Sequence, residues 1–265
     1  MKRALTIAGS DSGAGAGVQA DLKTFAARGV YGASVITAVT AQNTLRVTRV
    51  LELPLEIIEA QIDAVLCDIG ADAVKTGMLS SAPIVELVAK KVREWGVERL
   101  VVDSVMVAKG GDRLLREDAV TAVREKLLAL ALVLTPNLPE AEVLVGRPVR
   151  TREQRKRAAR EIAAMGVRNV VIKGGHAEGA PVDLLFDGRD FTEYSAERIE
   201  SRNTHGGGCT FSAAVAAELA KGRGVPEAVG EAKRYVTEAI RQAPEIGGGH
   251  GPLNHFPRGA ATTTE

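Results

Sequence analysis

Short apolar runs alternate with longer amphipathic segments along nearly the whole 265-residue chain, and this alternation limits the possible folds more than any other feature. Several runs have the length of buried strands: 4–8, 31–39, 73–75, 100–103, 132–134 and 170–172. The longer segments carry helical periodicity: 55–66, 83–95, 117–128, 208–220 and 226–242. This spacing predicts βαβ units and a largely parallel sheet. We therefore expect an α/β fold whose chemistry lies beyond the carboxyl ends of the strands.

The chain has no long linker, composition break or internal repeat. We expect a single domain over residues 1–257, with 258–265 as a flexible C-terminal tail. Two short apolar runs, 182–186 and 191–194, are joined through Asp187-Gly188 and predict a hairpin.

Charge and aromatic content disfavour a nucleic-acid-binding protein. Lys and Arg together number 34, Asp and Glu number 33, and aromatic residues make up only 3% of the chain. Nucleic-acid binding would be expected to show a basic stripe with stacking aromatic side chains. The basic run at 150–160 also has an apolar side, which predicts a solvated helix face.

Targeting signals are not evident in the sequence. Cys67 and Cys209 cannot form a disulfide framework. The N-terminal apolar run is too short for a signal peptide, and the uncharged stretch between Arg28 and Arg46 is too polar for a membrane span. We expect a cytoplasmic protein that makes no membrane contact.

The segment 203–210, Asn-Thr-His-Gly-Gly-Gly-Cys-Thr, enters a predicted helix and carries the strongest functional signal. Gly206, Gly207 and Gly208 leave backbone N–H groups free to converge on an anion, and the helix N-terminus adds partial positive charge. This suits a phosphate, or the charge that develops on a phosphoryl group in transfer. Cys209 lies in the first helical turn, where we expect a lowered thiol pKa. The alternative is a flexible turn followed by a small buried cysteine.

A second glycine-rich loop, 9–17, follows the first predicted strand. It lacks the third glycine of a dinucleotide-binding loop and the Lys-Ser/Thr ending of a P-loop. Its glycines can let the backbone approach a small substrate, or they can simply form a tight turn.

Oxygen-bearing side chains follow two further strands. Asp103 ends one strand, and Asn137 and Glu140 come just after the next. Such ligands near a phosphate site suit Mg²⁺. The alternative is structural, since Asn137 can cap a helix over 138–145.

Two other strand ends carry polar groups. The Gln42 amide offers a donor beside an acceptor, which complements an aminopyrimidine edge but also many other groups. Lys173, in the segment 173–176, can reach nucleotide phosphates. The histidines have no zinc-like spacing, and we interpret each of them as structural; they lie at 176, 205, 250 and 255.

Taken in order, these segments resemble the hydroxymethylpyrimidine/phosphomethylpyrimidine kinases of thiamine biosynthesis. The collinear motifs span residues 4–256 and are highly specific as a set. Besides the Cys209 segment they are IAGSDSG at 7–13, VQADLKTF at 18–25, TAQNT at 40–44, KTGML at 75–79, DSVMVAK at 103–109, TPNLPEA at 135–141, KGGH at 173–176 and GHGPLNHF at 249–256.

The resemblance implies a three-layer α/β/α ribokinase-like fold with a mostly parallel central sheet. It also implies ATP-dependent phosphorylation of 4-amino-5-hydroxymethyl-2-methylpyrimidine (HMP), and then of HMP phosphate to the pyrophosphate. By the same resemblance, Gln42 would pair with the aminopyrimidine edge. Gly9, Asp21, Met78 and Val105 would line the substrate pocket.

The resemblance further assigns the phosphate side of the site. Asn137 and Glu140 would position Mg²⁺ and the triphosphate, Asp103 would assist the metal partly through water, and Lys173 would lie near the phosphates. The segment 206–209 would form the anion hole, with Cys209 as base or as positioner of the substrate hydroxyl. Gly207 departs from the family, which usually has threonine there.

Alternatives remain at this stage. A pyridoxal or pyridoxine kinase of the same fold is the nearest, and Gln42 favours the pyrimidine over it. A non-catalytic ligand sensor is a distant alternative, disfavoured because Cys209, Asn137 and Glu140 are all present. The family is commonly dimeric, so we expect a homodimer. Gly110-Gly111 is a candidate hinge.

Overall fold

The computed structural model describes residues 1–105, 117–175 and 179–259. The candidate hinge Gly110-Gly111, His176 and residues 260–265 of the expected tail lie outside the described residues.

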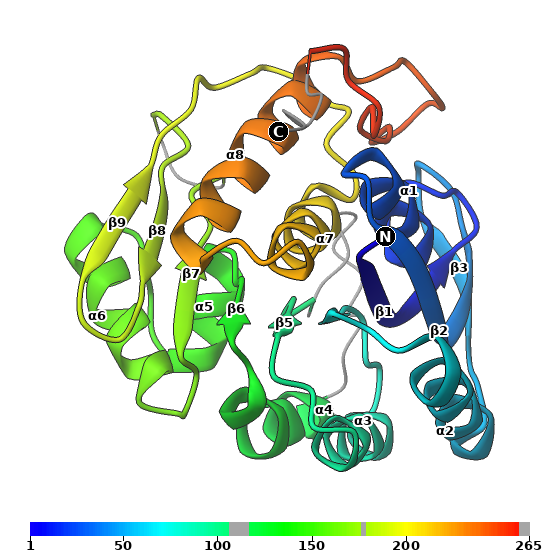
Figure 1. The fold of residues 1–265 in the computed structure, drawn as a ribbon. Coiled ribbons are helices and arrows are strands. Elements are labelled where there is room, and N and C mark those ends of the chain that lie inside the picture. Colours follow the sequence, from blue (N-terminus) through cyan, green and yellow to red (C-terminus); the bar gives the residue numbers. More distant parts are fainter. Residues whose placement is uncertain (106–116, 176–178, 260–265) are drawn as a thin grey trace.

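Within the described residues, nine strands form one sheet in the order β3-β2-β1-β4-β5-β6-β7-β8-β9 (Figure 1). Their bounds are β1 (Arg3–Asp11), β2 (Tyr31–Gln42), β3 (Val47–Glu52), β4 (Ala73–Thr76), β5 (Leu100–Val102), β6 (Val133–Leu134), β7 (Asn169–Ile172), β8 (Asp183–Phe186) and β9 (Phe191–Tyr194). The run from β2 through β7 is parallel. β3 is antiparallel to β2, and β8 to β7, while β8 and β9 form the predicted hairpin. The mostly parallel sheet is confirmed.

Helices cover both faces of this sheet, which confirms the three-layer arrangement (Figure 1). One face carries α1 (Gly17–Ala27), α7 (Gly207–Ala220) and α8 (Val225–Arg241), packed around Phe25 and Phe211. The other face carries α2 (Leu55–Ala64), α3 (Ala82–Glu94), α4 (Glu117–Ala122), α5 (Leu138–Val145) and α6 (Arg152–Ala163). A π-helical turn extends α2 over Val65–Ile69, and α4 continues as a π turn over Val123–Leu127 and a 3₁₀ turn over Leu128–Leu130.

Local sequence signals explain where α6 begins and which side of it is buried. Thr151 caps α6 and Gln154 completes the capping box, as the pattern predicts. The basic run in this helix is solvated, whereas Ala158 and Ile162 on its other side are fully buried. The solvated-face prediction for 150–160 is therefore confirmed.

Strand β3 was not expected from the sequence. It lies at the edge of the sheet, and the side chains of its central residues, Thr48–Leu51, are all exposed. Because neither face of the strand is buried, its sequence carries no apolar alternation to detect. β2 also runs further than expected, to Gln42, which carries that side chain to the end of the parallel sheet.

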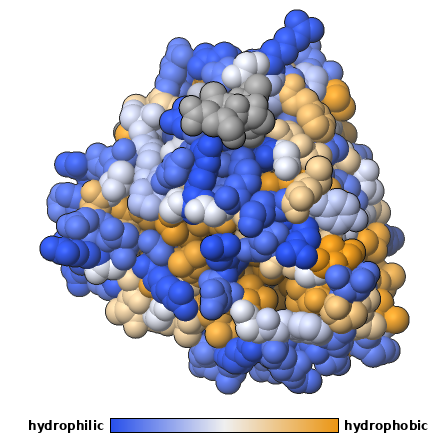
Figure 2. Space-filling model, viewed as in Figure 1, coloured by the Kyte–Doolittle hydropathy of each residue, from blue (hydrophilic) through white to orange (hydrophobic). Residues whose placement is uncertain are grey.

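The surface shown in Figure 2 is largely hydrophilic, and hydrophobic residues gather toward the side on which β2 and β3 lie. Val39, Leu45, Val50 and Leu51 are exposed there. None of the helices in the described ranges is both long and apolar enough to span a membrane.

Candidate active site

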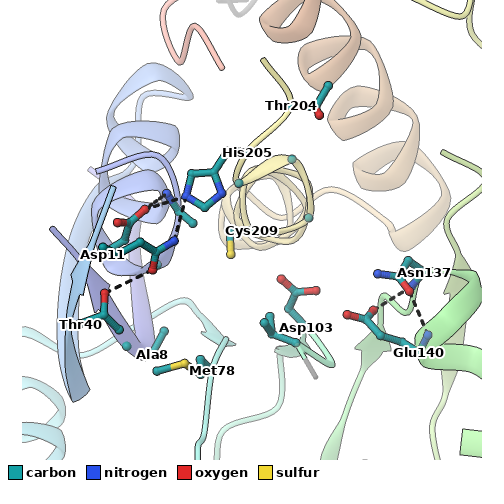
Figure 3. A pocket seen from close by; sticks show the side chains of 18 of the residues that line it. Ala8, Asp11, Thr40, Met78, Asp103, Asn137, Glu140, Thr204, His205 and Cys209 are labelled. Atoms are coloured by element: carbon teal, nitrogen blue, oxygen red, sulfur yellow. Dashed lines mark hydrogen bonds and ion pairs between the residues drawn. The ribbon is translucent and has the colours of Figure 1, made fainter. Parts of the chain in front are cut away.

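The carboxyl ends of the parallel strands open onto a cavity of about 390 Å³ (Figure 3). The first glycine loop and the N-terminus of α7 close one side of it. The structure brings nearly all of the expected site residues to its wall: Gly9, Gln42, Met78, Asp103, Val105, Asn137, Glu140, Lys173, Gly206, Gly207, Gly208 and Cys209. The cavity thus lies beyond the strand ends, where we expect the chemistry.

Asp21 is the exception, because it lies behind the cavity wall rather than in it. Its carboxylate is fully buried and accepts hydrogen bonds from Lys75 Nζ at 2.8 and 3.0 Å and from Thr6 Oγ1 at 2.6 Å. Lys75 is also fully buried. A buried ammonium needs a carboxylate partner, so Asp21 is held beneath the site by Lys75 and does not face a ligand.

The two glycine loops pack against each other at the top of the cavity. Gly206 caps α7 with φ of +78°, and a Cβ there would lie 1.8 Å from the Gly15 carbonyl oxygen. Only glycine combines that conformation with such an approach. The N–H groups of Gly208 and Cys209 follow in the first turn of α7, where no intrahelical acceptor exists for them. The arrangement suits an anion at this point.

The expected lowering of the Cys209 thiol pKa is wrong. The pKa of Cys209 is raised to about 12, chiefly by burial and in smaller part by the carboxylates of Asp103 and Asp21. Lys75 and a hydrogen bond from the Gly17 N–H act in the opposite direction without cancelling burial. The side chain is therefore a thiol at neutral pH, even though it stands in the first turn of a helix.

Asp103 and Lys173 form an ion pair on the cavity floor. Lys173 Nζ lies 3.2 Å from Asp103 Oδ1, and Ser212 Oγ, on α7, donates to Asp103 Oδ2 at 3.2 Å. Burial alone would lower the pKa of Lys173, but Asp103 and Glu140 raise it above its usual value. Lys173 therefore keeps its positive charge at the edge of the cavity, next to the Gly208 backbone.

Asn137 and Glu140 confirm the structural interpretation, that Asn137 caps the helix that follows it. Asn137 Oδ1 accepts from the Glu140 N–H at 2.9 Å, and Glu140 Oε2 accepts from the Asn137 N–H at 2.8 Å, which is a complete capping box for α5. Both residues also line the cavity (Figure 3). Burial raises the pKa of Glu140 to about 7, opposed by Lys173 and reinforced by Asp103.

The carboxylates of Glu140 and Asp103 fit a magnesium ion. A divalent cation beside Glu140 would offset the cost of a buried carboxylate, and Asp103 adds oxygen ligands across the same space. The described residues hold no group of three or more His, Cys, Asp or Glu side chains placed to bind a metal. Mg²⁺ does not need one, since it commonly binds through one or two carboxylates, substrate phosphates and water.

The opposite wall is suited to a flat ring. Met78 packs over Gly9, where a Cβ would lie 2.4 Å from the methionine Cε. The wall therefore offers an apolar surface and an approachable backbone in one place. Gln42 borders this surface at the end of β2.

His205 and Asp11 are site residues that the sequence reasoning missed. His205 Nε2 lies 2.9 Å from Asp11 Oδ2, and the same carboxylate accepts backbone N–H groups of Gly13, Gly15 and Ala16. Both side chains line the cavity, so treating His205 as merely structural was incomplete. Their positions inside the two glycine loops were the available signal.

The sheet order, the glycine-rich N-terminus of α7 and the cavity with Asp103, Glu140 and Lys173 at the strand ends are those of a ribokinase-like small-molecule kinase. Residues 11–254 match the family model described as phosphomethylpyrimidine kinase, and the chain belongs to that family.

Individual relatives agree with this assignment. A hydroxymethylpyrimidine/phosphomethylpyrimidine kinase of Rhizobium meliloti is 54% identical over 96% of this chain and 97% of its own length. One from Bacillus subtilis is 50% identical over 96% of this chain and 94% of its own. Among solved structures, a Bacillus subtilis pyridoxal kinase with ADP superimposes with a TM-score of 0.91 at 43% identity, covering 97% of this chain and 98% of that one.

Proposed function

We propose that this kinase transfers the γ-phosphoryl group of MgATP to the hydroxymethyl group of HMP, and then a second one to HMP phosphate. Family membership supports the kinase activity and its use of ATP. The roles of individual residues rest on the geometry of the cavity.

The pyrimidine ring stacks against the wall that Met78 and the Gly9 backbone form together, with Val105 at its edge. Gln42 pairs with the aminopyrimidine edge, because a primary amide offers one donor and one acceptor to a ring nitrogen and an adjacent amine. This placement directs the hydroxymethyl group toward Cys209, across the cavity (Figure 3).

The phosphate side is built from three kinds of positive potential. Lys173 supplies a fixed charge, and the N–H groups of Gly208 and Cys209 supply the helix N-terminus. Glu140 and Asp103 would hold Mg²⁺, partly through water, and Asn137 would orient the triphosphate. When bound, Mg²⁺ neutralises phosphate charge; phosphoryl transfer depends chiefly on such positioning and charge neutralisation.

Cys209 orients the substrate hydroxyl. With a thiol pKa near 12 it is not an ionised base in the free protein. Its sulfur can accept a hydrogen bond from the hydroxyl as the oxygen approaches phosphorus. As the new O–P bond forms and the bond to ADP breaks, the hydroxyl proton passes to an oxygen of the transferred phosphoryl group. The second transfer uses the same groups and needs room for one additional phosphate.

The observation that carries this proposal is that Gln42 and Cys209 line the same cavity. The test is a coupled ATP-consumption assay with HMP, HMP phosphate and pyridoxal, each with Mg²⁺. Turnover of both pyrimidines is expected. Absence of ATP consumption on either pyrimidine would refute the proposal.

Two variants localise the activity. Cys209→Ala should lose about 10²-fold or more in kcat, whereas Cys67→Ala, at an exposed cysteine in the turn after α2, should match the parent. Gln42→Ala should harm pyrimidine turnover more than any pyridoxal turnover, since pyridoxal carries a hydroxyl where HMP has its amine. An equal loss on the two substrates would remove the argument from Gln42.

We also propose that residues 1–257 act as one domain and that the protein is a cytoplasmic homodimer. Apolar side chains exposed around β2 and β3 support a contact with a second copy. Light scattering after size exclusion gives the mass directly, and a monomer at micromolar concentration would refute the dimer.

A further inference from the structure

A chain of polar contacts runs along the substrate side of the cavity from Asp11 to Thr40. His205 Nε2 lies 2.9 Å from Asp11 Oδ2 and 3.3 Å from Gln42 Nε2. At its other end, the Gln42 amide lies with Oε1 3.3 Å from Thr40 Oγ1. Oxygen and nitrogen of a carboxamide exchange places by a half-turn that leaves such distances nearly unchanged. The neighbours therefore decide which atom occupies which end.

The first neighbour, His205, must be a hydrogen-bond donor at Nε2. A carboxylate can only accept, so at 2.9 Å from Asp11 the ring nitrogen carries its hydrogen. Asp11 is ionised: burial by itself would raise its pKa, but His205 and the loop N–H groups hold the pKa below its usual value. A protonated ring nitrogen cannot also accept from an amide NH₂. The Gln42 atom that faces this nitrogen is therefore better satisfied as an oxygen, which shares the Nε2 hydrogen with Asp11 at the longer distance of 3.3 Å, than as an NH₂.

The second neighbour leads to the same conclusion independently. The Thr40 hydroxyl has one hydrogen, and the Ser10 carbonyl oxygen accepts it at 2.9 Å, closer than the 3.3 Å to Gln42. Toward Gln42 the hydroxyl then presents a lone pair. That lone pair is satisfied by an amide NH₂ and not by an amide oxygen.

We propose that His205, held by Asp11, is a positioning residue that sets the polarity of the Gln42 amide, with oxygen toward His205 and NH₂ toward Thr40, and so selects the 4-amino pyrimidine edge. This rests on the proposed function, because the substrate must meet Gln42. The amide oxygen keeps one lone pair and the NH₂ keeps one N–H for the substrate. The pyrimidine ring therefore meets an acceptor on the His205 side and a donor on the Thr40 side.

The order of groups on HMP matches that polarity. The hydroxymethyl group, the 4-amino group and ring nitrogen N3 are on consecutive ring atoms. His205 lies beside the N-terminus of α7 near Cys209, whereas Thr40 lies further away on β2 (Figure 3). With the hydroxymethyl group at Cys209, the amino donor falls on the His205 side, opposite the Gln42 oxygen. N3 falls on the Thr40 side, opposite the amide NH₂.

The decisive probe is the 4-oxo analogue of HMP, 5-hydroxymethyl-2-methylpyrimidin-4-one. It has nearly the same shape, but it presents an acceptor at position 4 and an N–H donor at N3, the inverse pattern. Wild-type protein should prefer HMP in kcat/KM by about 100-fold or more, since two buried polar contacts would be mismatched. In His205→Phe only the 3.3 Å contact to Thr40 still favours this orientation of the amide, and the preference for HMP should fall to about 10-fold or less.

His205→Gln is the rescue variant, because its amide can keep an N–H donor near the position of Nε2, oriented by the same Asp11 carboxylate. It should restore most of the preference. A purely structural role for His205 would lower kcat/KM on both pyrimidines equally and leave their ratio unchanged. An unchanged ratio in His205→Phe would overturn the proposal while the kinase assignment stands.

Thr40→Val tests the other end of the Gln42 amide, and it is the alternative test if His205→Phe does not fold. Valine has no lone pair to accept from the amide NH₂, so the preference for HMP over its 4-oxo analogue should also fall. An unchanged ratio of the two kcat/KM values counts against the inference. Wild-type protein that turns over neither pyrimidine would instead refute the proposed function itself, so the two failures are distinguishable.

Discussion

Glu140 offers the sharpest test of the site's electrostatics. Its carboxylate is buried, and the start of α5 depends on one hydrogen-bonding oxygen of this side chain but not on its charge. Both of its bonds, from the Asn137 N–H at 2.8 Å and from Ser104 Oγ at 3.3 Å, go to the same atom, Oε2. In Glu140→Gln a single amide oxygen can take over both bonds, and glutamine also completes a capping box. The substitution therefore removes the charge and keeps the helix start.

The expected magnitude follows from the pKa of Glu140, which rises from 4.5 to about 7 on folding. The folded protein disfavours the charged form, so wild-type stability is intact below about pH 4.5, falls as pH rises through about 7 and is then constant. At about 1.4 kcal/mol per pH unit the full loss is about 3 kcal/mol. Glu140→Gln should thus be more stable than wild type by about 1 kcal/mol at pH 5 and about 3 kcal/mol at pH 8.

Urea unfolding at pH 5, 6, 7 and 8, without nucleotide or metal, measures the difference. The matched control is Glu153→Gln in the first turn of α6, where the side chain is 80% exposed and the change should stay within about 0.5 kcal/mol. A stability difference for Glu140→Gln that does not grow with pH would refute the reasoning. The stabilised variant should also be a poor kinase, because a neutral amide is a weak magnesium ligand.

Three further outcomes are expected. Lys75→Met should lower the unfolding free energy by about 3–5 kcal/mol, because it leaves the buried Asp21 charge unpaired. The double variant Lys75→Met/Asp21→Leu should recover most of that loss. A double variant no more stable than Lys75→Met would contradict this. Gly206→Ala should lower the melting temperature and abolish turnover, since its φ of +78° and the adjacent carbonyl oxygen leave no space for a Cβ; near-parental activity would exclude the described packing. Iodoacetamide at pH 8 should label the exposed Cys67 at least about tenfold faster than Cys209, because the pKa of Cys209 is raised to about 12. Peptide mass spectrometry follows the two labelling rates. Preferential labelling of Cys209 would mean that its thiol is ionised.

Much of the fold could be predicted because burial leaves a pattern in the sequence. Strands covered on both faces read as continuous apolar runs, and the helices between them read as amphipathic. β3 could not be found this way, since its exposed central side chains impose no pattern. The hairpin formed by β8 and β9 was found, because its two apolar runs flank an Asp-Gly turn.

Several wall residues could be predicted for a different reason: Gln42, Asp103, Asn137, Glu140 and Lys173 lie at or just after strands whose carboxyl ends meet at one edge of the sheet. Gly9, Met78 and Val105 were expected only from the family resemblance. The environments of the site residues could not be predicted. The placement of Asp21 depends on a partner 54 residues away, Lys75. The pKa of Cys209 depends on burial among several loops that converge only in the folded chain. The contact between His205 and Asp11 joins two loops that no local spacing relates.

That last contact has a consequence for how the enzyme is made. Asp11 and His205 are 194 residues apart, and the first glycine loop is held in shape by Asp11 while the second is tied to it through His205. A ribosome adds about 5–20 residues per second, so on the order of 10–40 s separates the synthesis of the two residues. During that interval the substrate side of the pocket has no partner to close against. Catalytic competence should therefore arise in one late event, and nascent chains that stop before the second glycine loop should be inert rather than partly active.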